Sequence, residues 1–228
     1  MSYKKEFIEF MVRAGVLTFG DFTTKSGRKT PYFVNTGNYK TGAQADKLGY
    51  FYASCINENI KAGKISNDIV ALFGPAYKGI PISVATAISM SRDFDKDINY
   101  CFNRKEEKDH GEGGKMVGYK LQDGDNILMV EDVITAGTAV RETLPQLMAA
   151  AKVNISGLII SVDRMERGQG EKTAIQEIEE EFGIKTYPLV TVREIIDAMH
   201  NTEVDGKIVI DDEMKKRMED YLQEYCVK

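Results

Sequence analysis

Five short apolar runs recur through the middle of the chain, and segments of helical character lie between them. The runs lie at Ile69–Phe73, Ile98–Phe102, Ile127–Val133, Leu158–Val162 and Lys185–Val190. Unbroken apolar runs are typical of strands buried on both faces, and strand–helix alternation is typical of a parallel sheet covered by helices. We therefore predict an α/β fold with a mostly parallel five-stranded sheet flanked by helices. Because such sheets bind ligands beyond the carboxyl ends of their strands, the chemistry is expected just after these runs.

Apolar spacing and turn residues predict the remaining elements. We expect helices at residues 3–14, 42–60, 79–92, 138–151, 171–182, 192–200 and 212–225. Residues 16–40 differ, because β-type residues there are interrupted by glycines and a proline, which indicates a small lobe of strands and turns. Pro145 falls inside one predicted helix, where we expect a kink or an early break.

The length and composition limit the class of protein. Of the 228 residues, 43% are hydrophobic and 29% charged, which is enough to bury the core of one soluble globular domain. We expect a single domain over 1–228, with a hood over about 1–40, an α/β core over about 41–200 and a helical tail over about 201–228. The net charge of -5 argues against general binding to nucleic acid or to anionic membranes.

The sequence also bears on where the protein works. No apolar stretch of the signal-peptide kind opens it, and no window approaches the ~18 apolar residues of a membrane span. The three cysteines are odd in number and far apart, which favours reduced thiols over a disulfide framework. With two histidines and no CxxC pair, no structural zinc site is expected. We therefore expect a cytoplasmic protein with no membrane partner.

Residues 126–139, NILMVEDVITAGTA, join an apolar run to two adjacent carboxylates and a turn of small residues. Small residues let backbone N–H groups approach a phosphate, and the start of the following helix adds partial positive charge. Glu131 and Asp132 are acceptors suited to the vicinal hydroxyls of a sugar, while Thr135 and Thr138 add donors. The segment therefore predicts a site for a ribose 5-phosphate. An ordinary strand–turn–helix with surface acids is the alternative.

This loop matches the signature of the type I phosphoribosyltransferases, which use 5-phosphoribosyl 1-pyrophosphate (PRPP). Four further segments extend the match: KSGRKTPYFVN (25–35), FGPAYKGIP (73–81), CFNRKEEKDHGEGG (101–114) and SVDRMERG (161–168). With them the chain resembles the bacterial members of the orotate phosphoribosyltransferase family over nearly its whole length. The resemblance implies the type I phosphoribosyltransferase fold with a small N-terminal hood lobe. It also implies Mg2+-dependent transfer of the phosphoribosyl group from PRPP to orotate, which gives orotidine 5′-monophosphate and pyrophosphate in pyrimidine synthesis.

The resemblance implies a set of residues that bind PRPP. Tyr77 and Lys78, in the turn after the first apolar run, correspond to a pair that contacts PRPP, and this turn contacts the pyrophosphate. The whole expected set is Tyr77, Lys78, Arg104, Lys105, Lys108, His110, Glu131, Asp132, Val133, Ile134, Thr135, Ala136, Gly137, Thr138 and Ala139. No dedicated metal ligand is expected, since PRPP and water would supply most of the Mg2+ shell.

Between Asn103 and Lys115 the chain has no apolar residue, so this stretch cannot anchor itself in a core and is expected to move without ligand. A surface hairpin is the alternative. By resemblance it is the catalytic lid, which closes over PRPP and reaches across the interface of a homodimer. The implied catalytic residues are Lys108, His110, Arg104 and Asp132. Either Lys108 or His110 would protonate the pyrophosphate, and the sequence does not choose between them.

For orotate the resemblance implies contacts from Lys25, Phe33, Val34, Thr135 and Arg164. A guanidinium suits bidentate pairing with the carboxylate of the orotate ring. For Arg164 alone, a surface salt bridge with Glu166 is the alternative.

Three other functions compete with transfer to orotate. A relative acting on a purine base or uracil would share the loop, but the KSGR segment, the lid and Arg164 favour orotate. A PRPP-sensing regulator would need a DNA-binding domain or a basic face, and neither is apparent. A generic nucleotide-binding α/β module would explain the fold but not the five segments.

Overall fold

The computed structural model describes residues 3–24, 27–106, 115–134, 136–168 and 170–227. They form two compact units. The core unit consists of Ala45–Ser161 and Ala174–Leu189. The terminal unit consists of Met1–Gln44, Val162–Thr173 and Val190–Lys228. The sequence-based division into hood, core and tail stays a prediction.

Within the described residues, a six-stranded sheet with the order β5-β4-β3-β6-β7-β8 forms the centre of the fold. Its strands are β3 (Ala71–Gly74), β4 (Asn99–Asn103), β5 (Met116–Gly118), β6 (Asn126–Val130), β7 (Asn154–Asp163) and β8 (Thr186–Thr191). β3 pairs in parallel with β4 and β6, and β6 pairs in parallel with β7. Each of the five apolar runs forms a strand, so the predicted mostly parallel sheet is confirmed. β5 adds a short antiparallel edge that lacks the apolar length needed to predict it.

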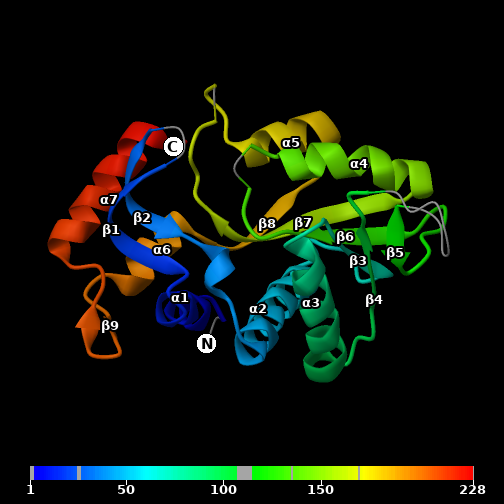
Figure 1. Cartoon of the computed structure of the whole chain (residues 1–228), viewed down its shortest axis with the longest axis horizontal. Helices are drawn as coiled ribbons and strands as arrows, with labels where there is room; N and C mark the ends of the chain where they lie inside the picture. The colour runs from blue at the N-terminus through cyan, green and yellow to red at the C-terminus, as the bar shows by residue number, and fades with distance from the viewer. Residues whose placement is uncertain (1–2, 25–26, 107–114, 135, 169, 228) are drawn as a thin grey trace. The chain divides into compact units, whose positions relative to one another are not determined.

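Helices cover both faces of this sheet, and Figure 1 shows α4 (Thr138–Ala150) and α5 (Ala174–Phe182) on the face opposite α2 (Gly42–Lys61) and α3 (Gly79–Phe94). The strands therefore bury their side chains on either side. Toward α4 and α5 they contribute to one apolar cluster, which includes Phe73, Met129, Leu144 and Ile178. The sheet and its four helices are the elements that carry the loops described below.

The early helix break expected at Pro145 is wrong, because α4 continues through this residue to Ala150. Pro145 is exposed, so the carbonyl whose hydrogen bond the ring removes lies on the solvent side of the helix. On the opposite side, Leu144 and Leu147 are buried in the apolar cluster. Burial of these two leucines outweighs the loss of one solvent-side hydrogen bond.

The terminal unit combines a two-stranded sheet with helices from both ends of the chain. Its elements are α1 (Tyr3–Arg13), β1 (Leu17–Thr23), β2 (Lys29–Val34), η1 (Thr36–Asn38), α6 (Val192–Met199), β9 (Glu203–Val204), β10 (Lys207–Ile208) and α7 (Asp212–Tyr225). β1 and β2 pair antiparallel, and α7 packs against β2. The start of α6 is fixed by a capping box between Thr191 and Glu194, and the start of α7 by Asp211, whose side chain accepts from Met214 N.

The three cysteines, Cys55, Cys101 and Cys226, are free, as the sequence predicts, and all three are buried. Among the described residues, no helix is long and apolar enough to cross a membrane. The cytoplasmic location stays a prediction.

Candidate active site

Two buried carboxylates stand where β6 ends, at the carboxyl edge of the sheet. Glu131 is 8% exposed and Asp132 is 6% exposed. Glu131 Oε1 accepts a hydrogen bond from Asp132 N at 3.0 Å, and Asp132 Oδ1 accepts one from Val133 N at 2.6 Å. Burial is the main cause that raises the pKa of Glu131 to about 7, and the neighbouring Asp132 adds to it. The surface-acid alternative is therefore wrong for this pair.

The backbone under these acids is tied to the elements on either side. Tyr52, which is fully buried in α2, donates its hydroxyl to the carbonyl of Glu131 at 2.7 Å. The hydroxyl of Ser161, in β7, donates to the carbonyl of Asp132 at 2.6 Å, and Ser161 N donates to the same oxygen. The two acids thus project from a backbone that neighbouring elements hold in place.

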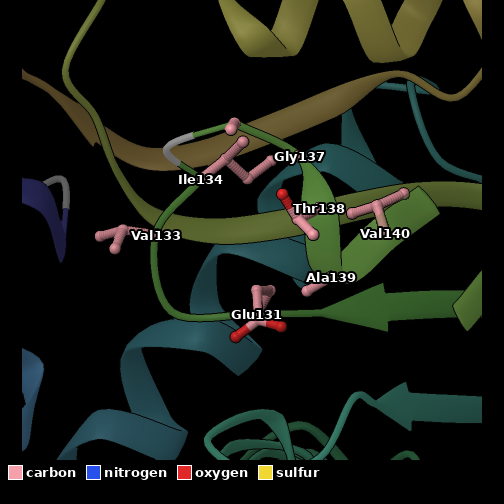
Figure 2. A pocket seen from close by; sticks show the side chains of 8 residues that line it. Glu131, Val133, Ile134, Gly137, Thr138, Ala139 and Val140 are labelled. Atoms are coloured by element: carbon pink, nitrogen blue, oxygen red, sulfur yellow. The ribbon is translucent and has the colours of Figure 1, made fainter. Parts of the chain in front are cut away.

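The loop after the acids leads into α4 and borders a half-open pocket of about 220 Å³. Its lining consists of Glu131, Val133, Ile134, Ala136, Gly137, Thr138, Ala139 and Val140. Figure 2 shows the loop curving around this space, with Glu131 at its strand end and Thr138 at its helix end. Gly137 caps α4 at a positive φ of 69° without a side-chain cap hydrogen bond. The first N–H groups of α4 have no partner within the helix, and they suit a phosphate oxygen.

A second loop follows β3, where the sequence reads Gly-Pro-Ala-Tyr-Lys-Gly. Gly74 allows α3 to approach the strand closely, because a side chain there would meet the carbonyl oxygen of Gly79 at 2.1 Å. The loop is fixed from β4, since Asn103 Oδ1 accepts from Ala76 N at 2.8 Å. Asn103 is 3% exposed and also donates to Gln146 Oε1 at 3.2 Å, so β4, this loop and α4 are joined through one amide.

Basic side chains converge on this loop from within the core unit. Lys78 Nζ lies 2.8 Å from Asp132 Oδ2, which joins the β3 loop to the acid pair of β6. Lys105 Nζ lies 5.5 Å from the ring centre of Tyr77, whose side chain is largely exposed. Four of the residues expected at PRPP are thus drawn together in two pairs.

The expected lid joins β4 to β5. Asn103 pairs with Met116 in the antiparallel ladder, and Arg104 N donates to the carbonyl of Lys115 at 2.7 Å, which closes the base of the hairpin. Lys108 and His110 lie outside the described residues, so their roles stay predictions.

The residues expected at orotate belong to the terminal unit, apart from Thr135. Phe33 is half-exposed in β2 and stacks on Phe22, and Val34 pairs with Leu17 of β1. Arg164 follows β7 and donates from Nε and Nη2 to Glu166 Oε1, at 3.0 and 2.7 Å. The ion pair with Glu166 that was the alternative for Arg164 therefore exists, but it is mostly buried rather than a surface bridge, with 20% and 18% of the two side chains exposed. Lys25 and Thr135 lie outside the described residues.

Sequence reasoning missed Asn103, Tyr52 and Ser161, which hold the two loops of the core unit. Asn103 and Ser161 carried a weak signal, since each is a polar residue in or at the end of an apolar strand. Tyr52 carried none, because a tyrosine inside a helix gives no indication of which backbone carbonyl its hydroxyl will reach. Within the described chain, no group of three or more His, Cys, Asp or Glu side chains could hold a metal ion.

Known proteins share this sequence and fold. Residues 36–189 match the phosphoribosyl transferase domain family. An orotate phosphoribosyltransferase of Clostridium beijerinckii is 59% identical over 227 residues, covering 100% of this chain and 99% of the relative. That of Lachnoclostridium phytofermentans is 56% identical, covering 99% and 98%. The crystal structure of an orotate phosphoribosyltransferase from Francisella tularensis matches with a TM-score of 0.80 at 34% identity, covering 97% of this chain and 99% of that one. The chain therefore belongs to the orotate phosphoribosyltransferase family.

Proposed function

We propose that this protein transfers the 5-phosphoribosyl group of PRPP to orotate, giving orotidine 5′-monophosphate and pyrophosphate. The observation that carries the proposal is the buried acid pair at the end of β6, joined by Asp132 to Lys78 of the β3 loop. A sugar phosphate and a pyrophosphate need the residue types that these two loops bring together. Membership of the family supports orotate as the acceptor.

In the core unit, the start of α4 would hold the 5-phosphate, and Glu131 and Asp132 would accept hydrogen bonds from the ribose hydroxyls. Tyr77 and basic side chains of the β3 loop and the lid would contact the pyrophosphate oxygens. The proposed basic set is Lys78, Arg104, Lys105, Lys108 and His110. Lys78 is already beside Asp132, so it is available where the sugar and the leaving group adjoin.

In the reaction, ring nitrogen N1 of orotate releases its proton to water and forms a bond to the anomeric carbon, while the bond from that carbon to pyrophosphate breaks. The electron pair leaves with the pyrophosphate, and the configuration inverts. Positive charge develops on the sugar, where the two carboxylates would stabilise it, and negative charge develops on the leaving group, where the basic side chains would do so. Lys108 or His110 would supply a proton to the pyrophosphate.

For the acceptor base, we propose contacts from Lys25, Phe33, Val34, Thr135 and Arg164. Arg164 suits the orotate carboxylate, because a guanidinium can pair with two oxygens at once.

Mg2+ is proposed as the cofactor. The carboxylate oxygens of Glu131 and Asp132 are of the hard type that this ion accepts, so the donor set fits, although PRPP and water would supply most of its shell. Bound there, the ion would neutralise charge on the pyrophosphate. We further propose a homodimer in which each lid serves the partner's site.

A direct assay tests the reaction. The protein is mixed with Mg2+, PRPP and orotate, and the loss of orotate absorbance is followed, with hypoxanthine, guanine and uracil as comparison bases. Turnover with orotate and not with the others is expected, and loss of turnover on chelation of Mg2+ is expected. Turnover with another base but none with orotate would overturn the substrate assignment.

The shared lid has its own test. A Lys108→Ala protein and an Arg164→Ala protein are each expected to have little activity, and mixing them should restore part of it. Verified heterodimers without regained activity would show that each lid serves its own site.

A further inference from the structure

Glu166 is the centre of a mostly buried polar cluster in the terminal unit. Among the described residues, four side chains contact its carboxylate: Oε1 accepts from Arg164, from the hydroxyl of Tyr221 at 2.7 Å and from that of Tyr32 at 3.3 Å, while Oε2 lies 3.4 Å from Nη1 of Arg28. The cluster joins β2, the segment after β7 and α7, which are far apart in the sequence. A carboxylate with this many donors has few lone-pair positions left for a ligand.

The hydrogen bonds to Glu166 show which edge of the Arg164 guanidinium group it occupies. Both hydrogen bonds come from the Nε–Nη2 edge of the guanidinium and end on one oxygen. The plane of the group is further held by Tyr32, whose ring centre lies 5.2 Å from Cζ. A guanidinium has a second edge, Nη1–Nη2, that can also pair with a carboxylate. Among the described residues, Glu166 pairs with the side edge of Arg164 and not with Nη1, so the end edge is the one that we assign to an external acid.

The C-terminal helix holds Glu166 in turn. Tyr221 is 5% exposed, and its ring meets that of Tyr32 edge-to-face at 6.0 Å. Burial, followed by the hydrogen bond to Glu166, raises the pKa of Tyr221 to about 12, so the phenol keeps the proton that it donates. The backbone is tied as well, since Arg167 N donates to the carbonyl of Tyr225 and Val227 N to that of Met165. The end of the chain thus packs directly on the segment that carries Arg164.

We propose that Glu166, held by Tyr221 of α7, is a positioning residue that orients Arg164 toward the carboxylate of orotate. This inference rests on the proposed function. Fixing the guanidinium before substrate arrives removes the cost of ordering a long side chain during binding. The effect should therefore appear in affinity for ligands that carry the carboxylate, and not in the handling of PRPP.

Two variants test the proposal. Glu166→Gln keeps the size of the side chain but removes its charge, and Tyr221→Phe removes only the hydroxyl that holds Glu166. We expect the KM for orotate to rise about tenfold in Glu166→Gln and about threefold in Tyr221→Phe, in line with the ordering cost of one or two side chains. The KM for PRPP should stay within twofold. Glu171→Gln, in the exposed pair with Arg167, is the matched control and should change neither value.

A second measurement separates positioning from folding. Orotidine 5′-monophosphate and uridine 5′-monophosphate differ only by the carboxylate, so their affinities are measured by calorimetry for each variant. Glu166→Gln and Tyr221→Phe should weaken binding of the first and leave the second unchanged. Parallel loss for both nucleotides, or no loss for either, would overturn the proposal. If Glu166→Gln does not fold, Tyr221→Phe decides by the same ratio. A wild-type protein that does not convert orotate would instead reject the proposed function.

Discussion

The buried acid pair of the core unit and the mostly buried Glu166 of the terminal unit are surrounded in opposite ways. In the core unit, the side chain of Glu131 accepts one backbone N–H, and the two acids line or adjoin a loop cavity. In the terminal unit, Glu166 is surrounded by four donor side chains, two of them guanidinium groups. The difference suggests a division of work. An acid with few protein donors is suited to meet a ligand, whereas an acid saturated by donors is suited to hold another residue.

Burial without enough donors has a cost, because desolvation disfavours the charged form. For Glu131 this is seen in a pKa raised to about 7, with burial as the first cause. In the core unit, the charged form of Glu131 is therefore disfavoured, and hydrogen bonds from ligand hydroxyls would stabilise it. In the terminal unit, four donor side chains surround Glu166 instead. Four measurements test this contrast.

The largest effect is expected from Glu166→Ala. Removing one partner of a mostly buried ion pair leaves the charge of Arg164 uncompensated, which should lower the free energy of unfolding by about 3 kcal/mol. Urea unfolding measures this. The control is Glu171→Ala in the exposed pair with Arg167, expected to change stability by less than about 0.5 kcal/mol. Equal losses in both variants would mean that Glu166 is no more saturated than a surface acid.

Asp132→Asn should act on turnover rather than on folding. It removes the charge that pairs with Lys78 and weakens the acceptor proposed for a ribose hydroxyl, so kcat/KM for PRPP should fall about 30-fold, or about 2 kcal/mol. Asp68→Asn is the control, because Asp68 accepts from Asn126 at the opposite end of β6. Wild-type kcat/KM in Asp132→Asn would remove this acid from the ligand-binding group.

The raised pKa of Glu131 predicts that stability and PRPP affinity both depend on pH. Its folded pKa, about 7, lies above the ordinary 4.5, so the folded state binds the proton more tightly than the unfolded state. The stability from this group is thus full below pH 4.5 and is lost as the pH rises through about 7. PRPP affinity should change the other way, rising by up to about tenfold between pH 6 and 8 as the acceptor ionises. Glu131→Gln should flatten both profiles, and unchanged profiles would assign the titration elsewhere.

The smallest effect is expected from Tyr52→Phe. It removes the hydrogen bond to the carbonyl of Glu131 and should cost about 1 kcal/mol of stability. Tyr187→Phe, which removes a hydroxyl bond to the carbonyl of Lys64 on the exposed side of the same unit, should cost less. If the order were reversed, the backbone under the acid pair would not depend on α2.

The parts of the fold that could be predicted are those determined by local sequence patterns, such as apolar runs and helical periodicity. The apolar runs correspond to five of the six strands of the central sheet, and the helix at 212–225 was predicted with the bounds that the structure has. β5 was not predicted because three residues are too few to show a period. The early break expected at Pro145 was wrong because periodicity does not show that this proline faces water.

The candidate site divides in the same way. Glu131 and Asp132 were predicted because residue type and position at a strand end signal their chemistry, and Lys78 was predicted from the family resemblance. Asn103 and Tyr221 were not, because their roles depend on partners distant in sequence, at Ala76 and Glu166. Even Glu166, two residues after Arg164 in the motif, was considered only as the partner in a surface salt bridge, since exposure is a tertiary property.

The three buried cysteines can serve as chemical probes of local opening in the two units. Cys55 and Cys101 belong to the core unit and Cys226 to the terminal unit, where its sulfur lies 3.5 Å from the carbonyl of Arg164. Burial raises the pKa of both Cys101 and Cys226 to about 12, so neither thiol reacts readily while covered. The rate at which a thiol reagent modifies each sulfur under native conditions therefore measures how often its surroundings open. Mass spectrometry of the labelled peptides would show whether orotate slows the opening at Cys226 alone or across the whole chain.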